Sequence, residues 1–418
     1  MAVILFEDER ATQLEPVTLG RPAFAISCGS FRLVDLLAEL EQPFSAIVRP
    51  HLTGLVAEDF PSFRSPSAIA GGEAAVWVNA RAVPCAATLT ALRSLIAAGR
   101  PGAVRGATGM AAALVPASAV WKPSAGRVLP DDAFWEQLAL PNVAADIPLF
   151  EYPHDIIRHH QTIFADNLAL RLARGDYREI AAGVFAAEGA RLGEFCTIDA
   201  AGGPIVLDRG AAVGPYCYLS GPVYVGPHAR VIEHAALKDG ASLGHTTKIG
   251  GEVEASIIEP YTNKQHHGFL GHSYLGSWIN LGAGTCNSDL KNTYGTVNVE
   301  YRGRKVATGM QFVGTIVGDY AKTAINTGIF TGKVIGACSM MYGFVTTNVP
   351  SFTNYARLFG QVTAAPVEVL VATQRRMFAR RGVEQRPCDI QLLHDMHALT
   401  EPERKLLGEL LSLEPLSL

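Results

Sequence analysis

The sequence predicts three parts and a linker helix, over residues 1–150, 151–178, 179–350 and 351–418. We expect an α/β domain first, then the linker helix, a left-handed parallel β-helix and a helical tail. Three observations support this division. Apolar runs alternate with Ala-rich amphipathic segments in the first part, aliphatic residues recur at every sixth position in the β-helix, and helical spacing returns after it. A length of 418 residues is enough for more than one folding unit.

The first part contains short apolar runs among Ala-rich amphipathic segments, which suits a small α/β domain. These segments are Ala2–Phe6, Phe31–Leu40, Ala46–Val48, Ala75–Val78 and Ala87–Ala98. Helical spacing begins after Pro153 and predicts the linker helix. It returns after Pro350 in Val367–Phe378 and Leu392–Leu411, which predicts helices that close the open edge of the β-helix.

The most informative pattern is a period of six residues between Leu207 and Ile249. Each repeat has a large aliphatic residue and, four positions later, a small or β-branched one. Such a repeat describes one short strand and turn of a triangular coil, in which the aliphatic side chains point inward and stack between rungs. The aliphatic series is Leu207, Val213, Leu219, Val225, Val231, Leu237, Leu243 and Ile249, and the second is Ala211, Cys217, Val223, Ala229, Ala235, Ala241 and Thr247.

The period breaks near residues 255–270, resumes at Leu275 and Leu281, breaks again, and returns between Val317 and Met341. Breaks in a solenoid are usually loops that leave the coil, and such loops often carry function. The regular hexads therefore predict a scaffold, and the interruptions predict the functional residues.

The composition excludes several classes of protein. With 35 Lys and Arg against 39 Asp and Glu, the net charge is −4, which gives no basic excess for nucleic acid. The seven cysteines form no C-x-x-C pair, which favours a reducing compartment and predicts a cytoplasmic protein. The N-terminus turns acidic after five apolar residues, unlike a signal peptide. The apolar stretch Ala107–Trp121 is shorter than the roughly 20 residues that span a bilayer, so no membrane segment is expected.

Residues 261–291 concentrate His, Lys and Asn side chains near the interruptions. Within them, Gly271-His-Ser-Tyr-Leu-Gly276 followed by Asn280-Leu-Gly-Ala-Gly-Thr285 resembles the acetyltransferase half of bifunctional N-acetylglucosamine-1-phosphate uridyltransferases, the GlmU type. The stretches 302–309 and 317–326 are similar to archaeal and alternative bacterial members of that group. The resemblance covers residues 180 to 350 or so. It implies a homotrimer that acetylates glucosamine 1-phosphate from acetyl-CoA.

The resemblance also implies roles for single residues. His272 matches the general base, and imidazole suits this work because its ordinary pKa is near neutrality. The amide groups of Gly282–Thr285 are the simplest donors to the oxyanion of the tetrahedral intermediate. The remaining candidates are Tyr274 and Asn280 for the sugar, Lys264 and Lys291 (with Lys305 further along) for its phosphate, and Ala283, Ala324 and Tyr342 for coenzyme A. Between the two motifs the chain is about one hexapeptide shorter than the common bacterial pattern, which leaves the acceptor sugar open.

The opening Ala2–Pro22 resembles that of sugar-nucleotide pyrophosphorylases, in which a strand leads into a Gly-rich loop that binds nucleotide phosphates. This chain instead has the carboxylates Glu7, Asp8 and Glu9, which would repel a triphosphate. Arg21 and Arg32 are candidates to contact phosphate. Nucleotidyl transfer, which would use Mg²⁺, and a degenerate domain that helps assembly or binds a sugar nucleotide both stay open.

Two other classes of protein remain as alternatives. A trimeric β-helix metalloenzyme of the carbonic anhydrase kind would bind zinc through three histidines across a subunit boundary, for which His234, His267 and His272 have a permissible spacing. A non-catalytic trimeric scaffold would transfer no acetyl group. The leading interpretation assigns no metal, because zinc would leave Lys264 and Asn280 without a role.

Overall fold

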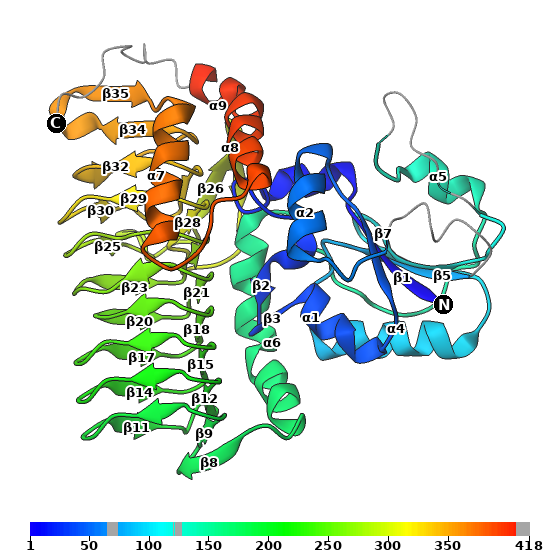
Figure 1. The fold of residues 1–418 in the computed structure, drawn as a ribbon, viewed down its shortest axis with the longest axis horizontal. Helices are drawn as coiled ribbons and strands as arrows, with labels where there is room; N and C mark the ends of the chain where they lie inside the picture. The colour runs from blue at the N-terminus through cyan, green and yellow to red at the C-terminus, as the bar shows by residue number, and fades with distance from the viewer. Residues whose placement is uncertain (65–73, 120, 122–127, 407–418) are drawn as a thin grey trace. The chain divides into compact units, whose positions relative to one another are not determined.

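The computed structural model describes residues 1–64, 74–119, 121 and 128–406. It divides into two compact units, Met1–Pro153 and His154–Leu418. The predicted order of an α/β region, a β-helix and C-terminal helices is confirmed (Figure 1). No helix within the described ranges is long and apolar enough to span a bilayer.

The first unit is built on a five-stranded mixed sheet in the order β4-β1-β5-β7-β6. Strand β1 is buried along its whole length between two parallel neighbours, which explains its unbroken apolar sequence. The strands are β1 (Ala2–Phe6), β4 (Phe44–Ile47), β5 (Ala75–Asn79), β6 (Gly102–Gly106) and β7 (Gly109–Val115), with the hairpin β2 (Ser27–Cys28) and β3 (Phe31–Arg32). The helices are α1 (Leu33–Leu37), α2 (Thr53–Asp59), α4 (Ala86–Ala98) and α5 (Asp132–Gln137).

The second unit is a parallel β-helix with three walls. The first wall comprises β8 (Arg178–Ala181), β9 (Val184–Ala186), β12 (Ile205–Leu207), β15 (Val223–Val225), β18 (Ala241–Leu243), β21 (Ile257–Ile258), β24 (Tyr274–Leu275), β28 (Thr315–Val317) and β31 (Lys333–Ile335). The second wall comprises β10 (Arg191–Leu192), β13 (Ala212–Val213), β16 (Arg230–Val231), β19 (Lys248–Ile249) and β22 (Asn263–Lys264). Bridges through Asn280 continue it into β29 (Lys322–Thr323), β32 (Met340–Met341), β34 (Thr353–Ala356) and β35 (Gln361–Ala364).

The third wall comprises β11 (Thr197–Asp199), β14 (Tyr218–Ser220), β17 (Ala236–Lys238), β20 (Glu252–Glu254) and β23 (Phe269–Gly271), and then β25 (Cys286–Asn287), β30 (Gly328–Ile329) and β33 (Phe344–Val345). The aliphatic hexad series points inward as predicted, and its side chains form one buried column. Hydrophobic burial along this column stabilises each rung only against its neighbours.

One prediction about the coil is wrong: no loop leaves it over residues 255–270. The core-facing positions continue as Val253, Ile258, Lys264 and Leu270, so the turns shorten while the strands stay paired. The aliphatic register breaks because the spacing changes and because a lysine takes a core-facing position. The second predicted break, between Leu281 and Val317, is confirmed as a loop: the chain leaves the coil after β25, and residues 288–314 include the antiparallel hairpin β26 (Asn298–Tyr301) and β27 (Arg304–Ala307).

Helix α6 (Pro153–Ala173) runs along the first wall. Phe164 and Leu168 pack there on Val206 and Tyr224, which are outward-facing residues of the coil. The Tyr224 hydroxyl donates to Asp208 at 2.6 Å. The helix therefore covers apolar surface that a free β-helix would expose.

The end of the coil is closed by a hairpin before the tail becomes helical. Strands β34 and β35 pair antiparallel, which covers the last parallel edge. The helices that follow are α7 (Val367–Ala379), α8 (Pro387–Leu399) and α9 (Glu401–Leu406), and the predicted helical residues 407–411 lie outside the described ranges. Trp278 connects α7 to the coil, because its ring packs on the rings of Tyr261 and Phe378. The centroids of these rings lie 4.1 Å and 4.4 Å from that of Trp278.

Candidate active site

His272 lies in the turn that joins β23 of the third wall to β24 of the first. Its φ of 45° is in the left-handed region, and its backbone is fixed on both sides. Its N–H donates to Glu254 O, and its own carbonyl accepts from Gly314 N. The turn therefore presents the imidazole from a rigid part of the coil.

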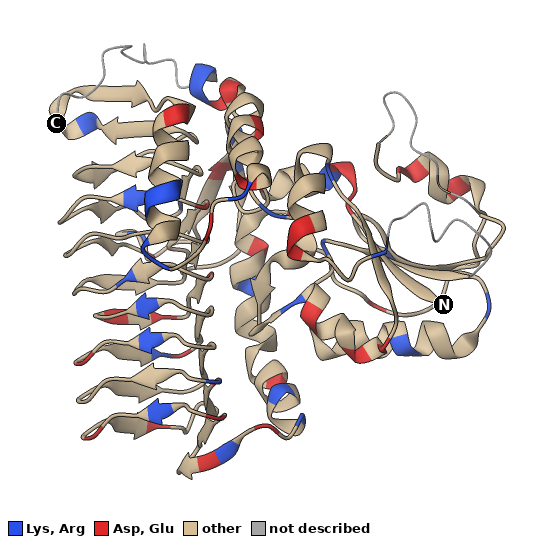
Figure 2. Cartoon of the chain, viewed as in Figure 1, with Lys and Arg blue, Asp and Glu red and all other residues tan. Residues whose placement is uncertain are grey.

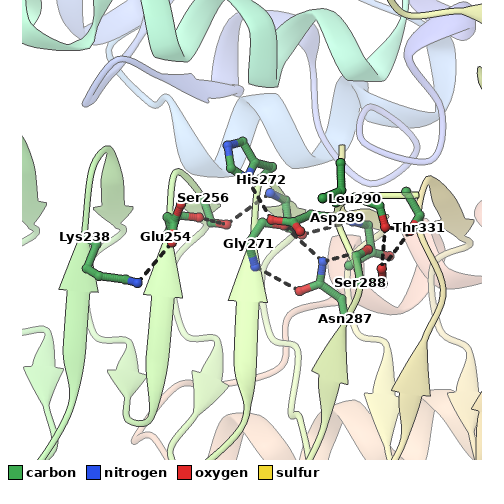
Figure 3. Close-up of polar contacts among 12 residues, drawn as sticks. Lys238, Glu254, Ser256, Gly271, His272, Asn287, Ser288, Asp289, Leu290 and Thr331 are labelled. Atoms are coloured by element: carbon green, nitrogen blue, oxygen red, sulfur yellow. Dashed lines mark hydrogen bonds and ion pairs between the residues drawn. The ribbon is translucent and has the colours of Figure 1, made fainter. Parts of the chain in front are cut away.

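The carboxylate of Asp289 holds this imidazole. The His272 Nδ1 to Asp289 Oδ2 distance is 2.8 Å, and both side chains are 13% exposed (Figure 3). The ring of Phe312 stacks on the imidazole at 5.0 Å. An Nδ1–H donated to the carboxylate leaves Nε2 as the free acceptor, which is the arrangement a general base needs.

Asp289 reaches His272 because the neighbouring backbone leaves room. A Cβ on Gly271 would lie 2.3 Å from Asp289 Oδ2, so only glycine allows this approach. Asn287 takes the core-facing position of β25, accepts from Gly271 N at 2.9 Å and donates to Gly271 O at 3.0 Å. Ser273 Oγ also donates to Gly271 O, at 2.7 Å. The Gly-His-Ser motif is thus a hydrogen-bonded cradle for the His–Asp pair.

Sequence reasoning missed Asp289, although the residue is visible in the sequence. It follows β25, where the coil is interrupted, and Val313 N donates to its carbonyl. A carboxylate at the start of an excursion from the coil was a usable signal. Its distance of 17 residues from His272 hid the pairing.

The structure places the predicted substrate residues on different walls. Tyr274 is fully buried on the first wall, and its hydroxyl donates to Glu259 at 2.7 Å. Asn280 is exposed on the second wall, between Asn263 and Lys322. Lys291 lies two residues after Asp289 and donates to Thr296 O at 2.7 Å. Of these residues, only Lys291 belongs to the loop that carries Asp289.

Lys264 is a core residue rather than a lysine of a surface loop, which corrects the prediction for its position. It is 2% exposed, and its Nζ donates to Gly250 O at 2.7 Å and His266 O at 2.9 Å. Burial lowers the pKa of its ammonium group to about 8. A contact with a substrate phosphate stays a prediction that the burial of this side chain does not favour.

We expect Lys264→Met to stabilise the protein at pH 7 by ~1–3 kcal/mol, less what the two lost hydrogen bonds contribute. The pKa of Lys264 is lowered in the folded state from about 10.4 in the unfolded chain. The unfolded state therefore binds more protons between these values, and wild-type stability rises with pH across that window. The advantage of the variant should shrink between pH 8 and 10 in urea denaturation. A stability difference between the variant and the wild type that stays constant with pH would contradict the buried-ammonium interpretation. Burial also lowers the pKa of Lys322, but this lysine and all other titratable groups are common to both proteins.

The three residues predicted to contact coenzyme A share one edge of the coil. Ala283, Ala324 and Tyr342 lie in successive rungs at the turn from the second wall to the third, and we call them the 283–342 column. Asn326 N donates to Ala283 O at 2.7 Å, which stacks two of these turns. The His272 turn is at the opposite edge of the third wall. One protomer therefore separates the 283–342 column from His272 by the width of that wall.

The predicted oxyanion donors lie on the same edge. The amides of Gly282, Gly284 and Thr285 already donate within the coil, to Thr323 Oγ1, His267 O and Gly282 O. Among the described residues the amide of Ala283 makes no hydrogen bond. Of the predicted oxyanion donors, the amide of Ala283 is therefore the one that remains available.

The three histidines of the zinc alternative are divided in the protomer. His234 and His267 lie at the edge of the 283–342 column, where His234 stacks on Tyr216 at 5.3 Å, whereas His272 is held by Asp289 at the other edge. Within the described residues, His, Cys, Asp and Glu side chains form no group of three or more that could hold a metal ion. The predicted zinc site would lie across a subunit boundary, so it stays an alternative prediction.

In the first unit, two of the three acidic residues of the opening loop, Glu7 and Asp8, form internal ion pairs. Glu7 is fully buried, and it accepts from Arg49 Nε at 3.0 Å and from the amides of Arg49 and Ala23. Asp8 accepts from Arg81 at 2.6 and 2.9 Å. This corrects the expected repulsion, because the carboxylates of Glu7 and Asp8 are neutralised.

The two arginines predicted to bind a nucleotide differ in their surroundings. Arg32 pairs with Asp35 at 2.7 and 2.8 Å, and Arg21 is buried with 9% exposure. Both positions reduce the availability of the guanidinium groups for a phosphate. Their nucleotide-binding role stays a prediction.

The chain thus combines an α/β domain with a hexapeptide β-helix that carries a hydrogen-bonded His–Asp pair. Residues 3–174 match the family described as sugar nucleotidyl transferase. The bifunctional sugar-1-phosphate nucleotidylyltransferase/acetyltransferase of Sulfurisphaera tokodaii is 28% identical over 148 residues, 35% of this chain and 37% of that protein. The bifunctional protein GlmU of Cupriavidus pinatubonensis is 32% identical over 114 residues, 26% of this chain and 24% of that protein.

The chain thus matches well under half the length of these relatives. Among solved structures, the Francisella novicida UDP-N-acetylglucosamine acyltransferase matches with a TM-score of 0.28 and 16% identity, over 54% of this chain and 81% of that one. AntD, an N-acyltransferase from Bacillus cereus, matches with a TM-score of 0.21 and 12% identity, over 51% and 96%. The predicted resemblance to bifunctional sugar-1-phosphate nucleotidyltransferase/acetyltransferases is confirmed.

Proposed function

We propose that the protein is an acyltransferase that moves an acetyl group from acetyl-CoA to the amine of an amino-sugar phosphate. The observation that carries the proposal is the His272–Asp289 pair, held in a rigid turn of the β-helix. The name of the Sulfurisphaera tokodaii relative supports it, since that name combines nucleotidyl transfer to a sugar 1-phosphate with acetyl transfer. Acetyl-CoA use also agrees with the predicted cytoplasmic location.

The proposed chemistry follows from the geometry of this pair. The sugar amine attacks the thioester carbonyl carbon, and Nε2 of His272 accepts the proton that the nitrogen loses. Asp289 holds Nδ1–H and stabilises the imidazolium that forms. The tetrahedral intermediate breaks its C–S bond, and the imidazolium returns the proton to the departing thiolate. The products are the N-acetyl sugar and free coenzyme A, so protons and electrons balance.

The proposal requires a homotrimer with a shared site, because one protomer places His272 and the 283–342 column at opposite edges of the third wall. A second protomer would bring its column, with the Ala283 amide as oxyanion donor, to the His272 of the first. Exposed apolar side chains on and beside the third wall support such an interface. They are Ile325 (68% exposed), Phe330 (49%) and Phe344 (58%).

The match of residues 3–174 supports a second candidate activity, sugar-1-phosphate nucleotidyl transfer. The loop residues do not fit this activity well. Glu7 and Asp8 are taken by Arg49 and Arg81, so they offer no carboxylate for Mg²⁺, and no step is assigned to that ion. The interpretation that the contacts favour is a first unit that keeps the fold without transferring a nucleotide.

The test measures thiol release from acetyl-CoA with a panel of amino-sugar phosphates and nucleotide sugars as acceptors. We expect saturable, acceptor-dependent release with at least one phosphorylated amino sugar. The matching N-acetyl sugar should give none, since its nitrogen has no free lone pair to attack. A parallel pyrophosphorylase assay with UTP and Mg²⁺ should show no turnover.

Each outcome of the panel is informative. Thiol release that does not depend on an acceptor amine would contradict the N-acetyltransferase, as would the absence of release across the panel. Turnover in the UTP assay would contradict only the assignment of the first unit. The two halves of the proposal therefore fail separately.

A further inference from the structure

Two basic side chains lie side by side on the outer face of the second wall. Arg230 of β16 and Lys248 of β19 are in register, while their neighbours Val231 and Ile249 point into the core. Adjacent strands are about 4.8 Å apart, so two like charges face each other directly. This pairing destabilises a sheet unless another charge compensates it.

The end of α7 adds more positive charge to the same place. Arg381 Nη2 donates to Asn263 Oδ1 at 2.5 Å, and Asn263 follows Lys248 in the register of the wall. The pKa of Lys248 is lowered first by burial and then by Arg381, Arg230 and Arg380, which are all cations. The basic group of Arg230, Lys248, Arg380 and Arg381 is therefore one electrostatic unit, formed by the wall and the end of α7. Figure 2 shows basic residues both at that end of α7 and along the coil.

Nothing in the described part of the chain balances these charges. None of the four basic side chains forms an ion pair with a described residue, whereas Lys238 on the third wall contacts both Glu252 at 2.5 Å and Glu254 at 3.1 Å. The carboxyl end of α7 contributes only about half a negative charge. Four cations that lie close together despite their repulsion are typical of an anion-binding site.

We propose that the basic group binds a phosphate-bearing ligand. Planar guanidinium groups donate in pairs to phosphate oxygens, and a lysine between them adds a point charge. The second wall does not border the His272 turn, which joins the third wall to the first. The proposed site is thus separate from the His–Asp pair within a protomer, and it stands whether or not His272 is a base. The ligand is either a separate phosphorylated metabolite or the phosphate groups of coenzyme A.

Calorimetric titration with inorganic pyrophosphate tests the site directly. We expect saturable binding to the full chain, and an affinity at least about tenfold lower for Arg230→Ala and for Lys248→Ala. Arg191→Ala is the matched control, because Arg191 faces outward in the same row of the same wall, beyond Ala212, away from the other cations. It should bind pyrophosphate like the wild type.

Stability provides a second readout that a solvated surface charge would not give. Without ligand, Lys248→Ala should melt at the same or a higher temperature than wild type, because it removes repulsion. Its melting temperature should rise less than that of wild type at the same pyrophosphate concentration. Absence of saturable binding, or equal binding by Lys248→Ala and Arg191→Ala, would overturn the proposal. Competition by coenzyme A would assign the site to its phosphates, and binding of pyrophosphate without such competition would assign it to a separate metabolite.

Discussion

Replacing His272 by asparagine should lower kcat/KM for acetyl transfer by about 10²-fold or more, because the variant has no group that accepts the amine proton. Asparagine is the informative substitution, since the φ of His272 is 45° and asparagine tolerates this region better than most residues. His272→Ala would add backbone strain to the loss of the base. The rate is measured as thiol release, and the fold is checked by circular dichroism.

The matched control is His228→Asn, which also has positive φ, at 56°, at another turn of the coil. It should retain wild-type turnover. Asp289→Asn should keep the imidazole in place but weaken the stabilisation of the imidazolium, so turnover falls and its dependence on pH changes. Unchanged turnover in His272→Asn would dismiss the base. Equal losses in His272→Asn and His228→Asn would show that the turn matters rather than the imidazole.

The coil could be predicted because its physical cause is local. Each rung needs an aliphatic residue at one position and a small one at the corner, and this requirement repeats in the sequence from Leu207 to Ile249. Where turns shorten, as between Ile249 and Ile258, the strands remain but the period disappears. The six-residue period is therefore interrupted in the sequence, although the coil continues in the structure.

The site could be predicted only in part. His272 was identified from its motif, but the partner that makes it a candidate base comes from the next rung, and rung-to-rung contacts do not show in a linear pattern. Lys264 shows the opposite error. A lysine among polar residues predicts a solvated side chain. The shorter turns between Ile249 and Ile258 shift the register, so that Lys264 takes a core-facing position, where two carbonyl groups accept from it.

The proposed site between two protomers makes a prediction that no single protomer can satisfy. His272→Asn and Ala283→Trp should each be inactive, the first without a base and the second with the 283–342 column blocked. In trimers assembled at random from equal amounts of both, about a quarter of the sites would combine an intact His272 with an intact column from the neighbour. Co-expression with different tags and purification of the mixed trimers should therefore recover about a quarter of wild-type activity.

The control for this recovery is a mixture of His272→Asn with Asp289→Asn. Both changes lie in the same His–Asp pair, so no protomer of the mixture holds that pair intact and no gain is expected. Recovery with Ala283→Trp but not with Asp289→Asn would therefore assign the base and the column to different protomers. Verified mixed trimers without recovery would place both in one protomer, against the distance that the third wall imposes, and a monomer in sedimentation would remove the shared site altogether.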